Sequence, residues 1–404
     1  MPRVVRGFAV VLAALLANTA GAAGASSEAD ELFQKVRAKA IDSARRMPRY
    51  TCVENISRAQ YRPAPGSPST CAALITMHRL VNARGALAVR DKLRLDVAVV
   101  DKGEIFSWAG AGKFETPDID KLVGGGVSGS GEFGSFLGSV FGGAPDVIRY
   151  LGLRNDFAAF EYNVPRAKSS YTYRSSVTDP SKTIGFHGSF LVDPADADLQ
   201  QLIVEADEFE QRDPACRVEQ TMNYQRVKIG SGDFLLPEVS TMKALYHNGS
   251  ESVNETRYSD CREYVGESTI RFDDVDPAVA AAGTAKAAAL QLPPKTRLQI
   301  SLAKPLDTEA AAAGDEVTAV GTFGRETDAV HGRILRLVDY MEPAPHWVIA
   351  IRFESIDRGG ATQPLSLKPP ENKKASPFPD LPPDAGVFTF DGRPNQFSAA
   401  WETR

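Results

Sequence analysis

The residue types best suited to catalysis or metal binding are scattered along this chain rather than grouped. The histidines occur singly, as His78, His187, His247, His331 and His346. The chain has no GxSxG, HExxH or CxxC motif, and no histidine lies beside a cysteine in sequence. We therefore predict a non-enzymatic protein with no catalytic residue, metal or cofactor. A Ser/His/Asp set assembled only in space stays open, because such sets are defined by geometry rather than by sequence order.

One glycine pattern matches the dinucleotide-binding fingerprint. It comprises Gly129, Gly131 and Gly134. The fingerprint works when a buried strand leads into it and a βαβ unit surrounds it, because the phosphates then meet a helix N-terminus. Neither context is present here, so we interpret the match as chance.

A different chemistry, the burial of an apolar ligand, is indicated by Lys121–Gly143. This segment is rich in glycine and almost uncharged, and its apolar residues fit one face of a short helix: Phe133, Phe136, Leu137, Val140 and Phe141. Such residues must rest on something, because exposed apolar patches mark binding sites or liabilities. With glycines on both sides as hinges, we interpret the segment as a mobile lid over an apolar cavity. The alternative is a flexible loop with an apolar anchor.

The candidate ligand-binding residues combine this lid with aromatic side chains that the predicted strands direct inward. They are Phe106, Trp108, Phe133, Phe136, Leu137, Phe141, Phe186 and Phe190. Each CH₂ group of a ligand buried among them would contribute about 0.8 kcal/mol.

Antiparallel strands are the elements that must position these residues. Gly185–Phe272 alternates apolar and polar residues between short Gly, Asn and Asp turns, which predicts a meander with one buried face. A slip in this alternation predicts a bulge near Asn223–Arg226. Before the meander we predict an amphipathic helix at Ser27–Met47, capped by Ser26 or Ser27. The further predicted strands are Tyr50–Tyr61, Ala72–Asn82, Leu93–Val100, Glu104–Trp108, Asp156–Val164 and Tyr171–Ser176.

The four cysteines are expected to form two disulfides. Closure of short loops favours Cys52–Cys71, which leaves Cys216–Cys261. A simple meander argues against the second bond, because it places Cys216 and Cys261 at opposite ends of the sheet. We predict the local pairing, with the other connectivities left open.

The N-terminus and the charge balance bear on localisation. Arg3 and Arg6 precede the apolar run Phe8–Leu16, and small residues follow to Ala25, which predicts a signal peptide over 1–25 and a periplasmic or secreted protein. The formal net charge of −5 provides no basic excess for nucleic acid.

The remaining chain divides by composition. An antiparallel β domain is predicted over 26–273 and an Ala-rich linker over 274–291. A small β-barrel or sandwich with a Pro-rich tail is predicted over 292–404. The fold class is therefore mainly β.

The first domain resembles the periplasmic lipoprotein-carrier (LolA/LolB-like) superfamily over residues 27–272. The resemblance rests on the helix, on Phe106-Ser107-Trp108, and on Phe186–Val192 followed by Asp193-Pro194. It implies a half-open β-barrel whose apolar concave face binds acyl chains beneath a helical lid. Four cysteines, a longer insertion and the C-terminal module depart from that family.

Our functional prediction is an exported envelope protein that binds an apolar ligand, either a lipid or an acylated component such as a lipoprotein. Peripheral association with the envelope is compatible with this. The alternative is a structural or protein-interaction protein whose core is filled by its own side chains. A third possibility is a secreted hydrolase, which requires a histidine within reach of a serine or carboxylate in a cleft.

Overall fold

The computed structural model describes the chain in ten segments. They are residues 17–81, 84–100, 103–125, 128–129, 131–143, 147–176, 178–264, 292–370, 377–394 and 396–404. The predicted linker (274–291) and most of the predicted signal peptide lie outside these residues.

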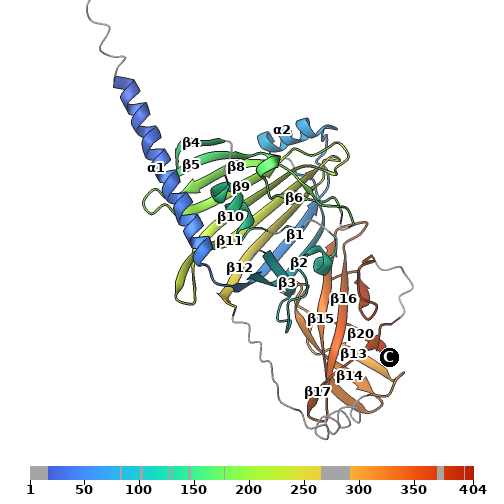
Figure 1. The fold of residues 1–404 in the computed structure, drawn as a ribbon. Coiled ribbons are helices and arrows are strands. Elements are labelled where there is room, and N and C mark those ends of the chain that lie inside the picture. The colour runs from blue at the N-terminus through green and yellow to red at the C-terminus, as the bar shows by residue number, and fades with distance from the viewer. Residues whose placement is uncertain are drawn as a thin grey trace, which may run out of the picture.

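The fold is mainly antiparallel β, as predicted, and the first module is a half-open meander (Figure 1). Its strands, in spatial order, are β4 (Val147–Arg154), β5 (Phe157–Val164), β8 (Phe186–Val192), β9 (Leu199–Ala206), β10 (Ala215–Ile229), β11 (Gly232–Tyr246), β12 (Glu251–Glu263), β1 (Tyr50–Tyr61), β2 (Leu87–Val100) and β3 (Gly103–Trp108). Strand β12 returns to lie beside β1, so the first strand is interior to the sheet.

The predicted bulge is confirmed in β10. The register with β11 shifts between Asn223 and Tyr224. Met222 and Tyr224, on either side of the shift, are buried, whereas further along the strand Ile229 is buried in the opposite phase. The bulge thus lets one long strand change its inward face part-way along its length.

Two predictions need correction: the start of the first helix, and a segment predicted as a strand that is a helix. Helix α1 spans Ala17–Arg46 and so starts ten residues before Ser27, because the Ala-rich stretch ahead of it also favours helix. The segment expected to be a strand at Ala72–Asn82 is instead helix α2 (Cys71–Val81). The backbone N–H of Leu74 donates to the carbonyl of Thr70, just before the helix, and the Leu74 side chain is fully buried.

Short elements occur between β3 and β8. They are α3 (Asp120–Val123), α4 (Ser135–Leu137), a π-helical turn (Gly138–Gly142), a 3-10 turn (Arg166–Lys168), β6 (Thr172–Tyr173) and β7 (Lys182–Thr183). The short helix predicted within Lys121–Gly143 is therefore present.

The C-terminal module consists of short and long antiparallel strands. Its strands are β13 (Arg297–Leu302), β14 (Glu316–Phe323), β15 (Glu326–Tyr340), β16 (His346–Arg358), β17 (Ala361–Pro364), β18 (Leu367–Lys368), β19 (Gly386–Phe390) and β20 (Ser398–Thr403). Pairing runs from β20 through β13, β14, β15 and β16 to β17, while β19 also pairs with β16 and β18 pairs with β20. Trp401 is buried at the centre of this module's core.

The two modules are joined by backbone pairing and by a shared core. Strand β2 pairs with β15 at Asp91–Val338 and the two following positions. Leu335 and Ala350 of the C-terminal module pack in the same cluster as Phe106 and Trp108 of the first module. Because one cluster draws on both modules, we expect the two to unfold together.

The disulfide prediction was wrong. Both bonds are long-range: Cys52 is bonded to Cys261 and Cys71 to Cys216. Cys52 and Cys261 lie opposite each other because β12 returns to pair with β1. The strand-length argument against Cys216–Cys261 was correct, and closure entropy was a poor guide because the sheet brings distant residues together.

Candidate functional site

The Gly-rich segment lies between α1 and the concave face of the sheet. Phe136 packs edge-on against Phe186, and Phe141 against Phe190, with ring centroids 5.9 and 5.2 Å apart. Phe33 of α1 packs on the other side of Phe141. The segment therefore forms a middle layer of the core rather than a loop over its surface.

The structure divides the predicted ligand-binding residues between two core clusters. Phe136, Phe141, Phe186 and Phe190 belong to one, with Leu137 partly buried against it. Phe106, Trp108 and Phe133 belong to the other, where Phe133 packs on Tyr50 and Tyr258. The Gly-rich segment thus contributes to both clusters and connects them.

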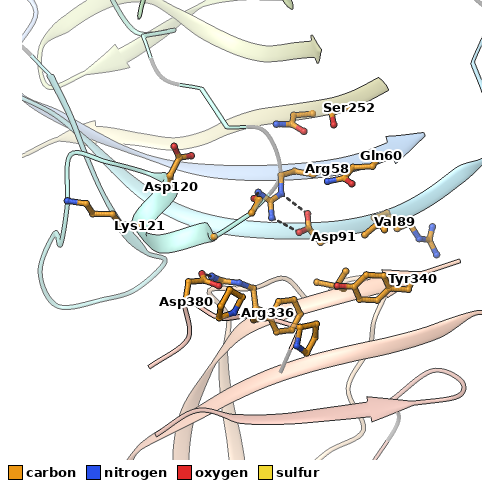
Figure 2. Close-up of a pocket in the computed structure, with 18 residues that line it drawn as sticks. Arg58, Gln60, Val89, Asp91, Asp120, Lys121, Ser252, Arg336, Tyr340 and Asp380 are labelled. Carbon is orange, nitrogen blue, oxygen red and sulfur yellow. Dashed lines mark hydrogen bonds and ion pairs between the residues drawn. The ribbon is translucent and has the colours of Figure 1, made fainter. Parts of the chain in front are cut away.

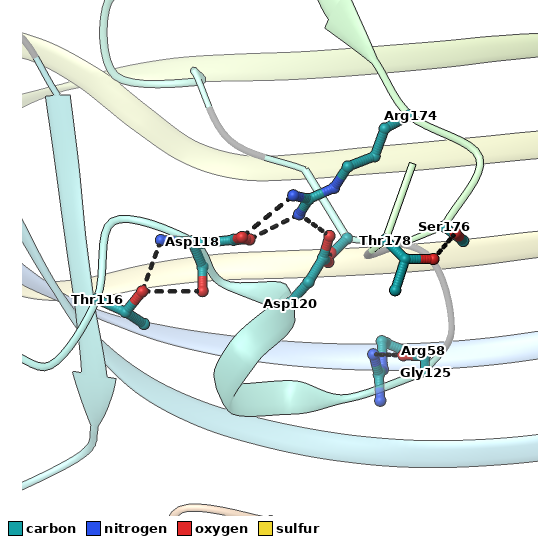
Figure 3. A network of polar contacts seen from close by, with 9 residues as sticks. Arg58, Thr116, Asp118, Asp120, Gly125, Arg174, Ser176 and Thr178 are labelled. Carbon is teal, nitrogen blue, oxygen red and sulfur yellow. Dashed lines mark hydrogen bonds and ion pairs between the residues drawn. The ribbon is translucent and has the colours of Figure 1, made fainter. Parts of the chain in front are cut away.

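Polar contacts fix the segment at three places. Near its start, Arg174 forms ion pairs with Asp118 and Asp120, which hold α3 against the β6–β7 hairpin (Figure 3). In its middle, both carboxylate oxygens of Glu104 accept the backbone N–H of Gly131 at 3.0 Å. Near its end, Arg37 of α1 donates to the carbonyl of Phe141 at 2.9 Å.

Three glutamates extend into the interior beneath this segment. Glu54 and Glu132 are buried, and Glu132 accepts a hydrogen bond from Gln220 at 2.5 Å. Burial raises the pKa of Glu54 well above its ordinary range, and it also raises the pKa of Glu132. Glu104 is only half-buried as a residue, yet desolvation of its carboxylate and the nearby Glu132 raise its pKa to about 8. Of the three, the Glu104 carboxyl group is therefore mainly protonated at neutral pH.

Sequence reasoning missed these glutamates, although signals for two of them were present. Glu54 stands at an inward position of β1, in phase with the buried residues Tyr50, Cys52 and Ile56. Glu132 is the one acidic residue in an apolar, Gly-rich run. A charged residue at an apolar position is the pattern that would have identified them.

A cleft of about 700 Å³ opens beside the buried segment. Its apolar wall comes from the C-terminal half of α1, from the Gly-rich segment and from strand ends: Val36, Ala40, Ile41, Phe133, Leu137, Phe141, Val99 and Leu235. Three of the eight predicted ligand-binding residues (Phe133, Leu137 and Phe141) line this cleft. The other five lie in the packed core beyond it.

The cleft has a charged rim. Asp198 forms ion pairs with Lys39 and with Arg226, and each nitrogen lies 2.5 Å from the Asp198 carboxylate oxygen. Arg45, Arg46 and Arg49 line the same cleft at and after the C-terminus of α1. An apolar wall with a small number of polar groups is the usual composition of a small-molecule site.

A second cleft, of about 590 Å³, separates the two modules (Figure 2). Its main charged groups already have partners. Arg58 forms a bidentate pair with Asp91, and Arg336 pairs with Asp380 while donating to the carbonyl of Leu122. Since paired charges line this space, we interpret it as the polar interface between the modules.

The histidines form no serine–histidine pair in the described part of the chain. His331 contacts Asp357 at 2.8 Å, but both side chains are about 40% exposed and neither lines the two clefts described above. His187 lies 3.5 Å from Glu205. Although burial alone would raise the pKa of Glu205, its bond to His187 and the charges of Arg217 and Arg79 lower it to about 2.

Among the residues that the structure describes, two groupings of side chains have the spacing of metal ligands. One comprises His187, Glu205 and Asp207, but two arginines already neutralise Glu205. The other comprises His247 with Cys71 and Cys216, whose sulfur atoms are bonded to each other. Neither offers an open set of ligands, because a metal ligand must supply an uncommitted lone pair.

Comparison with known proteins gives no assignment. No protein-family model, no curated protein and no solved structure matches this chain. Among the described helices, none has the length and apolar composition needed to cross a membrane. The two disulfides are typical of an oxidising environment.

Proposed function

We propose that this protein binds a molecule with a flexible apolar chain in the cleft between α1, the Gly-rich segment and the sheet. The observation that carries the proposal is the cleft itself. Its volume of about 700 Å³ lies within the range of roughly 300–1,000 Å³ typical of ligand sites, and its wall is apolar. No catalytic group is needed for this role.

The arrangement favours a chain-like ligand over a compact one. The cleft follows α1 for the two to three turns from Val36 to Arg46, which is about 15 Å at 1.5 Å per residue. An alkyl chain inserted along this path would exchange water for aliphatic and aromatic contacts, at about 0.8 kcal/mol for each CH₂ group. The lipid or acylated ligand predicted from the sequence fits this shape.

The C-terminal module and the disulfides hold the strands that border the cleft in place. Strand β1 is held on one side by the Cys52–Cys261 bond and on the other by β2, which pairs with β15 of the C-terminal module. Tyr50, at the start of β1, lines the cleft. We propose that the protein acts as an exported binding protein, in the periplasm or outside the cell, without enzymatic activity.

The test is a neutral fluorescent probe of apolar sites, such as N-phenyl-1-naphthylamine, with two matched variants of α1. Ala40→Trp fills the cleft, because Ala40 lines it. Ala38→Trp makes the same change on the exposed face of the same helix, away from the cleft. We expect Ala40→Trp to weaken probe binding at least tenfold and Ala38→Trp to leave it unchanged, with urea unfolding confirming that both variants are folded.

Absence of probe binding to the wild-type protein would overturn this proposal and leave the structural alternative. That alternative has its own observation, because Phe136, Phe186 and Phe190 already fill the core beside the cleft. Lipid extraction and mass spectrometry of the purified protein provide a second, independent measurement.

A further inference from the structure

The charged side chains around the cleft are mostly cationic. The cations that line it are Lys39, Arg45, Arg46, Arg49 and Arg226, and the acidic residues are Glu104 and Asp198. The whole chain, in contrast, carries a formal net charge of −5. The positive charge is therefore a local property of this cleft, opposite in sign to the rest of the molecule.

Ion pairing leaves part of this charge uncompensated. Asp198 is a single carboxylate shared by two cations, Lys39 and Arg226. Arg46 pairs with Asp42, one turn earlier in α1. Arg45 is exposed and has no partner among the residues that the structure describes.

The second acidic residue adds little negative charge at neutral pH. Glu104 lines the cleft and holds the backbone of Gly131, and desolvation together with Glu132 raises its pKa to about 8. At pH 7 its carboxyl group is mainly protonated. An anion placed in the cleft therefore meets cations at the rim without a fixed opposing charge at the wall.

We propose that the ligand of this cleft is an anionic amphiphile, an acyl chain bearing a carboxylate or phosphate head, whose head group lies against Lys39, Arg45 and Arg226. This inference rests on the function proposed above and specifies its ligand class. The apolar wall formed by Ala40 and Leu137 receives the chain, and the rim cations receive the head. Cations bind carboxylates and phosphates through charge-assisted hydrogen bonds.

The experiment compares two ligands with the same chain and different heads. Displacement of the neutral probe from the full-length protein is measured with myristate and with tetradecanol, each below its aggregation limit. Both titrations are carried out at 50 mM and at 500 mM NaCl. We expect myristate to bind roughly fivefold more tightly at low salt, since each exposed charge pair contributes only modestly to affinity. The difference should shrink at high salt because the rim is open to solvent. Tetradecyl phosphate replaces myristate in a parallel series.

Matched charge variants locate the effect. Arg45→Gln/Arg226→Gln removes two rim cations, and Asp198 keeps its partner Lys39. Lys35→Gln/Arg154→Gln removes the same charge from exposed positions outside the cleft. The rim variant should lose the preference for myristate and keep its affinity for tetradecanol, whereas the control variant should behave as wild type.

The outcomes separate this inference from the proposed function. Equal binding of myristate and tetradecanol to the wild-type protein overturns the anionic head and leaves the apolar site intact. Equal loss of preference in the rim and control variants also overturns it, because the effect would then reflect overall charge. Failure of the neutral probe to bind at all overturns both.

Discussion

The carboxylate of Glu104 gives a prediction whose sign and size follow from the structure. Glu104→Gln keeps an oxygen that can accept the Gly131 N–H and removes the ionisable proton. The folded pKa is about 8 against an ordinary value of 4.5, so the folded state holds this proton more tightly than the unfolded chain. The contribution of Glu104 to stability is therefore present in full below pH 4.5 and is lost as the pH rises to about 8.

The magnitude follows from the shift. One pKa unit corresponds to about 1.4 kcal/mol, so 3.5 units would give about 5 kcal/mol. Glu104 borders the cleft and water screens it, so we halve this to roughly 2–3 kcal/mol. The measured quantity is the free energy of unfolding of Glu104→Gln minus that of wild type. We expect this difference to be larger at pH 9 than at pH 5 by that amount, in favour of Glu104→Gln.

Urea unfolding of both proteins at pH 5, 7 and 9 measures this difference. Glu161→Gln is the matched control, because Glu161 is a strand glutamate whose pKa is lowered by Arg149. That control should not gain stability with rising pH. Parallel stability curves for Glu104→Gln and wild type would refute the claim that the Glu104 carboxylate is desolvated.

Further predictions concern packing, a disulfide and the hydrogen bond from Arg37 to Phe141. Phe136→Ala should lower the free energy of unfolding by about 3–5 kcal/mol in urea titrations, because this ring is 4% exposed. Leu137→Ala should cost less than half as much and weaken probe binding instead, since Leu137 lines the cleft; equal costs would contradict this division. Non-reducing peptide mapping should recover Cys52–Cys261, and Cys52→Ser/Cys261→Ser should lose roughly 2–5 kcal/mol, because the bond closes a separation of 209 residues. Arg37→Met should hasten limited proteolysis of the Gly-rich segment, because the bond to Phe141 is lost; an unchanged cleavage rate would count against that anchor.

The strands were predictable because burial of one sheet face leaves a period-two pattern. The hairpins of β10, β11 and β12 show it, and even the bulge near Asn223 left a trace as a change of phase. Helix α2 was mistaken for a strand because it is only eleven residues long and apolar, and periodicity does not separate a short helix from a buried strand. Its position beside β10 depends on the Cys71–Cys216 bond, which is a tertiary contact.

The site was only partly predictable for a related reason. The sequence identified the Gly-rich segment as apolar and predicted a mobile lid, whereas the structure places the segment in the core. Which of its residues line the cleft depends on α1 packing from above: Phe141 meets Phe33 and the cleft, whereas Phe136 meets Tyr171 and Phe186. Neighbouring residues of one segment thus differ through contacts with elements distant in sequence.

The burial of Phe136, Val140 and Phe141 changes which element we expect to move when a ligand binds. A lid that opened at its glycine hinges would withdraw three almost completely buried side chains from the core, at a cost of several kcal/mol. The C-terminal turns of α1 are less embedded: Val36 is buried, whereas Ala44, Arg45 and Arg46 are exposed. Displacing those turns would open the same cleft without disturbing the core. We therefore expect ligand binding to alter hydrogen exchange in the last two turns of α1 more than in the Gly-rich segment; the reverse pattern would restore the segment as the moving lid.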